Sequence, residues 1–167
     1  MTPSNAKRRL IWHGILIFLL GLLAGAFVPW LKNPRMGVAA HVGGVLSGIF
    51  LILVALIWEE IKLPLWAKKT DFWLFLYASH TGWLAQFLAA VFGTSRSMTV
   101  GGAGFTGNAW QEALVDFVAI TFSAAIALAG ILALWGLRMR QLNLSRDGRC
   151  GLSGAAHCWG DFLTHVG

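Results

Sequence analysis

Charged side chains are scarce in this chain. Asp, Glu, Lys and Arg make up 12% of its 167 residues, and only seven residues are acidic. Soluble globular domains carry about 25% charged residues, so the composition excludes a soluble protein with a solvated surface. Hydrophobic residues instead make up 57% of the chain, and the mean hydropathy is +0.67. This balance indicates an integral membrane protein.

Two further absences exclude other kinds of site. The chain has only two cysteines, Cys150 and Cys158, in a segment that we expect to form a cytoplasmic tail, where thiols stay reduced. His157 stands beside one of them, but the spacing matches no zinc-binding pattern. The glycine-rich loop 94–108 lacks the strand and the lysine of a phosphate-binding loop. We interpret this loop as a flexible outer lid or a re-entrant turn over the level of His41.

Four apolar stretches are long enough to cross a membrane, since a hydrocarbon core about 30 Å thick needs about 20 apolar residues per helix. We predict spans near residues 10–31, 37–58, 72–93 and 109–137. Five tryptophans lie near span ends, as interfacial anchors do: Trp12, Trp30, Trp58, Trp66 and Trp135. The expected fold is all-α, an integral membrane four-helix bundle formed by residues 1–140 and followed by the tail 141–167.

Basic residues are distributed unevenly between the two ends of the predicted bundle. Ten of them precede the first span, separate the second from the third, or follow the fourth: Lys7, Arg8, Arg9, Lys62, Lys68, Lys69, Arg138, Arg140, Arg146 and Arg149. Only Lys32, Arg35 and Arg96 lie at the other end. The positive-inside rule therefore places both termini in the cytoplasm. We expect a multi-pass protein of the bacterial inner membrane. These flanks and the membrane lipid explain the net charge of +6, and we expect no nucleic-acid partner.

His41 lies about one turn inside the second predicted span, on a stripe of glycines. Gly37, Gly44 and Gly48 share its helix face, so its imidazole projects over a surface without side chains. Ionisable groups in membrane spans are costly and usually functional, and a flat ligand would fit on this surface. Alternatively, the glycines let two helices approach closely and His41 forms a hydrogen bond across the contact. The residues alone leave both interpretations open.

Polar side chains from two further spans fall in the same outer half of the bundle. Gln86 lies in the third span, and Glu112 and Asp116 lie in the first two turns of the fourth. Their spacing of four residues puts both carboxylates on one helix face, with Asn108 one turn earlier. Asn108 and Gln111 also occupy the positions of a helix cap and its capping-box partner. Capping does not explain the deeper Asp116, so we predict that both carboxylates border a site.

Two more histidines, His13 and His80, lie closer to the cytoplasmic side than His41. A bis-histidine cytochrome needs two imidazoles at one depth, so His41 lacks a partner and would leave the opposite face of a metal open. His13 and His80 are candidates to pair with each other, and we expect a hydrogen-bonded packing role for each. At the outer rim, Arg35 and Lys32 would meet porphyrin propionates or phospholipid heads.

Three local sequences resemble a known family. They are the run NPRMGVAAHVGGVLSGIF at residues 33–50, Gly82-Trp83 in the third span, and TGNAWQEAL at residues 106–114. Together they resemble the hydroxylaminobenzene mutases, small four-helix membrane isomerases related to styrene oxide isomerase. The resemblance covers roughly residues 10–137, and its most specific part is the first two spans with their Asn-Pro-Arg-Met-Gly hinge.

The resemblance to styrene oxide isomerase implies a homotrimer that binds haem b through one axial histidine. The residues that would hold the haem are His41, Gly44, Gly48 and Arg35. Where the epoxide isomerases carry an asparagine two turns after the ligand, this chain has Ser47. Their active-site tyrosine falls on Ala89 or its neighbour. Both differences favour the mutase branch of the family.

We therefore expect an intramolecular isomerase that converts aryl hydroxylamines to 2-aminophenols, with haem iron as a Lewis acid. The expected catalytic residues are Glu112, Asp116, Gln86 and Ser47, and the expected substrate-binding residues are Trp83, Phe87, Trp110 and Asn108. The carboxylates would stabilise positive charge or remove the ring proton, and the aromatic rings would stack on the small aromatic substrate.

Three other functions remain as alternatives. The first is an epoxide isomerase of the styrene oxide type on the same scaffold. The second is a b-type cytochrome electron-transfer subunit, which would need two axial ligands. The third is a small transporter or structural bundle without haem, in which the glycines serve helix packing alone.

Overall fold

The protein is entirely helical over the part of the chain that the structure describes. The computed structural model describes the backbone of residues 3–164 and the side chains of residues 5–139. In chain order the elements are α1 (Pro3–Phe27), the 3-10 helix η1 (Val28–Trp30), α2 (Pro34–Ile57), α3 (Leu65–Phe92), the short α4 (Thr99–Gly102) and α5 (Ala109–Thr164). The predicted all-α class is confirmed.

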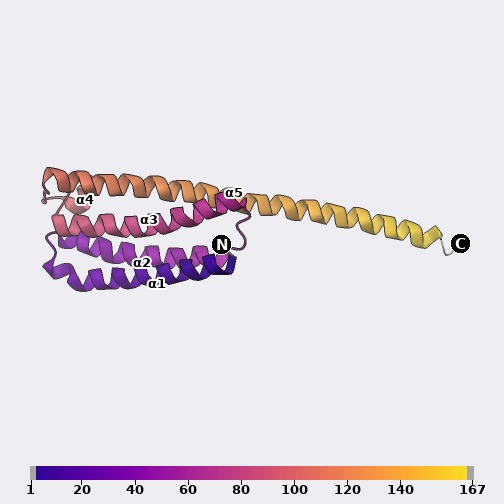
Figure 1. Ribbon diagram of the computed structural model, residues 1–167, viewed down its shortest axis with the longest axis horizontal. Helices are drawn as coiled ribbons and strands as arrows, with labels where there is room; N and C mark the ends of the chain where they lie inside the picture. The colour runs from indigo at the N-terminus through magenta and orange to yellow at the C-terminus, as the bar shows by residue number, and fades with distance from the viewer. Residues whose placement is uncertain (1–2, 165–167) are drawn as a thin grey trace.

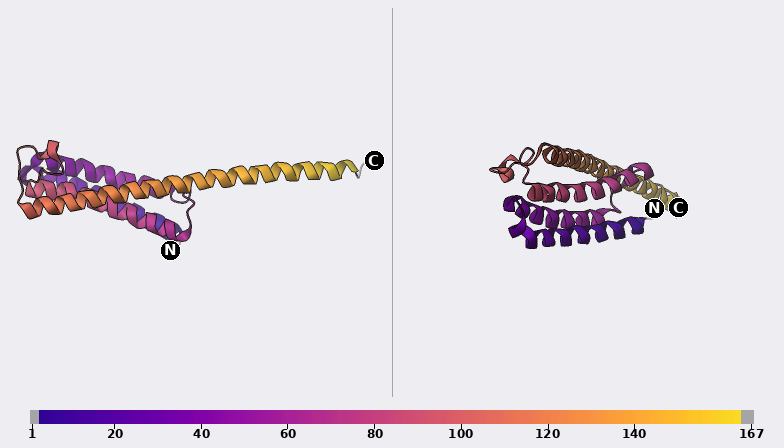
Figure 2. Two further views of the ribbon diagram at one scale, coloured as in Figure 1. Left: turned by 90° about the horizontal axis from the view of Figure 1, so that it is seen from above. Right: turned by 60° about the vertical axis from the view of Figure 1, so that its left-hand side comes forward.

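The four long helices lie side by side in the order α1, α2, α3 and α5, with α4 at one end (Figure 1). α5 packs against α3, on the side away from α1. It also continues to Thr164, beyond the predicted end of the fourth span at residue 137, and both views in Figure 2 show it extending past the other helices. The predictions for Cys150 and Cys158 lie outside the described side chains.

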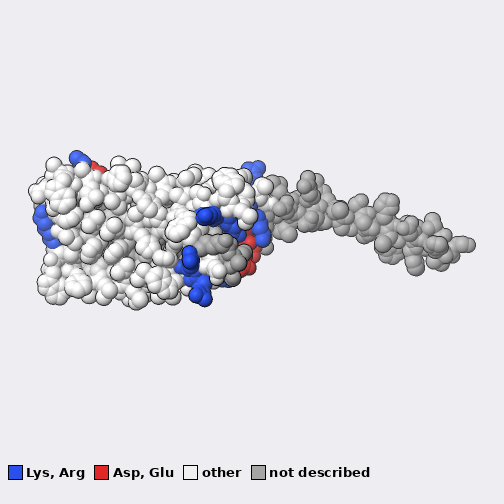
Figure 3. All heavy atoms as spheres, viewed as in Figure 1, with Lys and Arg blue, Asp and Glu red and all other residues white. Residues whose placement is uncertain are grey.

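Among the described residues, three segments are long and apolar enough to cross a membrane: Asn5–Trp30, Pro34–Ile57 and Ala109–Met139. They correspond to three of the four predicted spans. The remaining prediction, 72–93, corresponds in position to α3, whose apolar sequence is interrupted by polar residues such as His80 and Gln86. On the face shown in Figure 3, charged side chains gather at the two ends of the helices and leave an uncharged surface between them. This distribution indicates a membrane protein.

Four of the five tryptophans predicted as interfacial anchors are exposed: Trp12, Trp30, Trp66 and Trp135. The prediction was wrong for Trp58, which is only 1% exposed. Its ring packs edge-on against Phe72, and the Lys68 ammonium lies 5.5 Å from its centroid. Trp58 follows α2 directly and belongs to the same buried cluster as Phe72 and Ile61, so it is part of the core and does not lie at the membrane surface.

Glycines bring α1 and α2 into backbone contact. A Cβ on Gly44 would lie 2.6 Å from the Cα of Gly21, and a Cβ on Gly48 would lie 2.6 Å from the carbonyl oxygen of Gly14. Atoms do not approach this closely, so a side chain at these positions would force the helices apart. The interpretation that the glycines permit close helix approach is therefore confirmed for Gly44 and Gly48.

Asn33 joins three elements at the other end of α2. Its side chain accepts a hydrogen bond from the N–H of Met36 at 3.2 Å, which caps α2, and donates to the carbonyl oxygen of Gly101 at 2.9 Å. Its backbone N–H donates to the carbonyl oxygen of Ala90 near the end of α3. α3 then ends at Gly93, a glycine with φ of 68°. The buried Asn33 thus joins the start of α2 to the end of α3 and to α4 in the loop 94–108.

The α1–α2 contact predicts the effect of small substitutions. Gly44→Ala should lower the unfolding temperature of the detergent-solubilised protein, because the new methyl group overlaps the α1 backbone. Overpacking of this kind costs about 1–3 kcal/mol. Gly130→Ala is the matched control, since no atom outside its own helix backbone lies within 4 Å of a Cβ there. Circular dichroism during heating provides the measurement, and equal behaviour of the two variants would contradict the contact.

Candidate active site

His41 projects from α2 onto α1. Its Nδ1 lies 2.9 Å from the carbonyl oxygen of Gly21, and a Cβ on Gly25 would lie 2.5 Å from the same nitrogen. A carbonyl oxygen only accepts hydrogen bonds, so Nδ1 of the neutral ring carries the proton and Nε2 carries the lone pair. Among the described residues, no group forms a hydrogen bond with Nε2, and this atom is not enclosed by the chain. Nε2 is therefore available to a ligand.

The surroundings of this histidine fit an axial haem ligand in one respect. Metal-binding histidines usually donate the second ring N–H to a carbonyl or a carboxylate, and Gly21 supplies that carbonyl. The sequence suggested that a flat ligand could lie on the glycine face of α2. In the structure α1 covers Gly44 and Gly48, so one chain by itself leaves no room for a ring on these glycines. The exposed part of α2 beside the histidine carries Val38 and Val42, which are about half exposed.

Trp83 and Gln86 of α3 pack onto two adjacent glycines of α2. A Cβ on Gly43 would overlap the Gln86 amide, and a Cβ on Gly44 would lie 2.7 Å from Cδ1 of Trp83. The Trp83 ring stacks on Phe87 with centroids 5.2 Å apart and an angle of 16° between the planes. Its Nε1 is buried and has no hydrogen-bond partner in the described chain. The two rings expected to stack on a substrate therefore stack on each other.

Glu112 binds the outer loop through its carboxylate. It accepts hydrogen bonds from the backbone N–H groups of Ser95, Arg96 and Gly107 at distances of 3.0–3.2 Å. Asp116, one turn further along α5, pairs with the Arg96 side chain and accepts a hydrogen bond from the Ser97 hydroxyl. Both carboxylates therefore fasten the loop to α5, and no described contact joins either of them to His41.

Lys32 and Arg35 fasten the same loop from the start of α2. Lys32 donates to the carbonyl oxygens of Phe92 and Thr106, at 2.8 and 3.1 Å. Arg35 donates to the carbonyl oxygen of Ala103, and its guanidinium lies over the Phe105 ring. The loop 94–108 is thus tied to α2 and α5, whereas the sequence suggested either a flexible outer lid or a re-entrant turn.

The remaining predicted residues lie at the outer end or on α2. Asn108 donates its backbone N–H to the Gln111 side chain at 2.8 Å, which is one of the two hydrogen bonds of the predicted capping box. Trp110 is 59% exposed and contacts Phe92 edge-on. Ser47 is half-buried on α2. In the described part of the chain, no three His, Cys, Asp or Glu residues are grouped so as to hold a bare metal ion.

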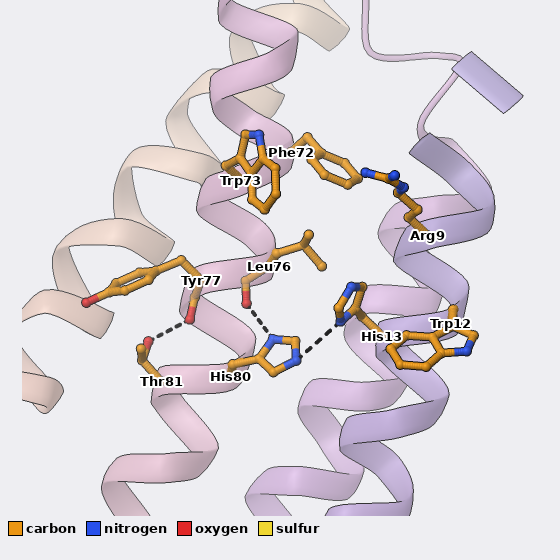
Figure 4. Close-up of a pocket in the computed structure, with 9 residues that line it drawn as sticks. All are labelled: Arg9, Trp12, His13, Phe72, Trp73, Leu76, Tyr77, His80 and Thr81. Atoms are coloured by element: carbon orange, nitrogen blue, oxygen red, sulfur yellow. Dashed lines mark hydrogen bonds between the residues drawn. The ribbon is translucent and has the colours of Figure 1, made fainter. Parts of the chain in front are cut away.

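His13 and His80 form the pair that the sequence predicted as one alternative. His13 Nδ1 lies 3.4 Å from His80 Nε2, and the two rings meet edge to face. They line a pocket between α1 and α3 with a volume of about 530 Å³ (Figure 4). Sequence analysis missed this pocket, although Trp73 and Tyr77 share the four-residue spacing of a helix face.

Sequence analysis also missed Asp71, one residue before the predicted third span. Its side chain is fully buried, and neither carboxylate oxygen has a hydrogen-bond partner among the described residues. Lys68, three residues earlier on α3, is the charged group that acts on this carboxylate.

Comparison with known proteins identifies the class of enzyme. The model of the styrene oxide isomerase family matches residues 6–138. The chain belongs to this family and is an isomerase. It is 41% identical to hydroxylaminobenzene mutase HabB of Ectopseudomonas oleovorans over 147 residues, which cover 87% of this chain and 90% of that protein.

A second mutase of the same organism is also similar. Hydroxylaminobenzene mutase HabA is 37% identical over 125 residues, which cover 74% of this chain and 93% of that protein. No solved structure matches the chain. The two mutases and the family match confirm the resemblance that the local sequences indicated.

The hydrogen bonds of Glu112 to the loop 94–108 predict that Glu112→Gln makes this loop easier to cleave. A glutamine keeps one acceptor oxygen and turns an N–H₂ group toward backbone donors, so the loop should open more often. Hydrogen bonds to a charged group contribute about 1.5–3 kcal/mol, which corresponds to at least about ten-fold faster trypsin cleavage after Arg96. Glu59→Gln, near the opposite end of α2, is the matched control. Equal cleavage rates in wild type and Glu112→Gln would show that the carboxylate does not hold the loop.

Proposed function

We propose that this isomerase converts hydroxylaminobenzene and related aryl hydroxylamines to 2-aminophenols. The reaction moves an oxygen atom from nitrogen to the ortho ring carbon without net oxidation or reduction. Identity of 41% over most of both chains to a hydroxylaminobenzene mutase is the observation that carries the proposal. An apolar, water-sensitive substrate partitions into lipid, which suits an enzyme built from apolar helices.

We propose that His41 holds haem b. A haem bound there would supply a Lewis acid that polarises the substrate oxygen. The Gly21 carbonyl supports this role, because it keeps the proton on Nδ1 and leaves Nε2 unprotonated. Because α1 covers the glycine face of α2 and Nε2 lacks a partner, a second copy of the chain would complete the site. This arrangement agrees with the homotrimer implied by the resemblance.

The other site residues divide into two groups in this proposal. Glu112 and Asp116 hold the outer loop and act as positioning residues, since their oxygens already accept hydrogen bonds from it. Trp110 keeps an exposed ring for stacking on an aromatic substrate. Gln86 and Ser47 are half-buried polar groups that would orient the substrate by hydrogen bonding. The apolar helices exclude water, which would otherwise compete with the ring for oxygen transfer.

We further propose four membrane spans, with both termini in the cytoplasm of a bacterial inner membrane. α3 lies side by side with the three strongly apolar helices, so it would share their membrane. The excess of basic residues at one end supports this orientation.

The family match favours one second candidate, an epoxide isomerase. Ser47 and Ala89 stand where the resemblance implies an asparagine and a tyrosine in those enzymes, so we rank this activity below the mutase activity. Offering styrene oxide as an alternative substrate separates the two candidates.

The mutase activity is tested with protein purified in detergent. Wild type should convert hydroxylaminobenzene to 2-aminophenol, with chromatography distinguishing this product from 4-aminophenol. His41→Ala should be at least about 100-fold slower, since Lewis-acid polarisation is worth several kcal/mol. Ser123→Ala, at an exposed position of α5, is the control. Turnover of styrene oxide without turnover of hydroxylaminobenzene would overturn the proposal in favour of the epoxide isomerase.

The haem is tested separately by visible absorption after expression with added haem precursor. Wild type should show a Soret band of high-spin shape, and His41→Ala should lose or weaken it. His13→Gln is the matched control, because it changes a histidine outside the proposed haem site. Full mutase activity in protein without a Soret band would remove the haem and leave the mutase assignment intact.

A further inference from the structure

The pocket between α1 and α3 has no part in the proposed reaction. Its volume of about 530 Å³ falls within the range of small-molecule sites, about 300–1,000 Å³. Its walls include the rings of Trp12, Phe72 and Trp73, and Arg9 lies at one side (Figure 4). Trp12 and Trp73 are 60% and 54% exposed, so the pocket opens at the surface of the protein.

Hydrogen bonds fix the tautomers of both histidines in this pocket. His80 Nδ1 lies 2.8 Å from the carbonyl oxygen of Leu76, which only accepts, so this nitrogen carries the proton. The Nε2 of neutral His80 is then an acceptor, and the contact at 3.4 Å requires His13 to donate from Nδ1. The lone pair of neutral His13 is consequently on Nε2.

His13 Nε2 is therefore an acceptor without a donor. Within the described chain no group forms a hydrogen bond with it. In Figure 4 this nitrogen points away from His80, toward the side on which Phe72 and Arg9 lie. The pocket thus combines aromatic walls, the acceptor nitrogen of His13 and the guanidinium of Arg9, which can lie over the face of an aromatic ring.

We propose that this pocket is a second binding site, for a small neutral aromatic molecule that carries an N–H or O–H group. The ring packs against Phe72 and Trp73, and its N–H or O–H donates to His13 Nε2. Aryl hydroxylamines and aminophenols have this chemistry, and the choice of them as ligands rests on the proposed function. An anionic ligand is less suited, because neutral His13 presents a lone pair to it.

This site is separate from His41. His13 precedes Gly21, which contacts His41, by eight residues of one helix, a rise of about 12 Å. Arg9 and the other basic residues at this end place the pocket at the proposed cytoplasmic side. The pocket would thus hold product or substrate between the cytoplasmic side and the reaction site.

The test is binding of 2-aminophenol to the full chain in lipid nanodiscs, measured by titration calorimetry. His13→Leu should bind about three- to ten-fold more weakly, the effect of one lost hydrogen bond, whereas His13→Gln restores an acceptor and should recover affinity. His41→Ala should keep the part of the binding that His13→Leu weakens. ortho-Xylene, which has the same shape without donors, should bind more weakly than 2-aminophenol and should not respond to His13→Leu.

Other outcomes would overturn the second site. They are loss of binding in His41→Ala with no change in His13→Leu, equal binding of ortho-xylene and 2-aminophenol, or no binding of 2-aminophenol because lipid or another copy of the chain fills the pocket. Helical circular dichroism of both His13 variants shows whether they fold, and His13→Gln remains informative if His13→Leu does not. Failure of mutase turnover, by contrast, bears on the proposed function and leaves this binding result unaffected.

Discussion

The rest of the structure depends on the backbone contact between α1 and α2. Only glycine fits at Gly21 and Gly44, because any Cβ there would overlap the facing helix. The same contact brings the Gly21 carbonyl to His41, whose imidazole lies over Gly25. The packing of α1 against α2 therefore also determines which ring nitrogen of His41 carries the proton. A larger residue at the contact would separate the helices and also release the ring nitrogen that the carbonyl holds.

Local signals in the sequence predicted much of the fold. Apolar runs of membrane length gave the long helices, and Asn108 with Gln111 gave the start of α5, because capping acts within one turn. α3 ends beside Gly93, at the predicted end of the third span, because glycine adopts a positive φ without strain. The family was also predictable, since its most specific residues lie in one continuous run at 33–50.

The site was harder to predict, because helical spacing shows which residues share a face but not what covers that face. The glycine stripe was open to two interpretations. Only the position of α1 shows that the backbone of this helix covers Gly44 and Gly48. Glu112 and Asp116 were expected to border a site on account of the cost of burying them. Apart from Gly107, their partners lie 16–20 residues earlier in the chain, and periodicity carries no information about such contacts.

The carboxylates and the histidines differ in how their polar atoms are satisfied, and this difference bears on mechanism. Glu112 and Asp116 already accept hydrogen bonds from the loop 94–108, so using either as a base would require the loop to open. The imidazoles His41 and His13 each keep one unpartnered nitrogen within the described chain. Chemistry that needs a free lone pair is therefore better served by the histidines, while the carboxylates supply rigidity. On this argument, catalysis in the proposed mutase would depend on what binds His41 and on the second copy proposed to complete its site, more than on acid–base groups of α5.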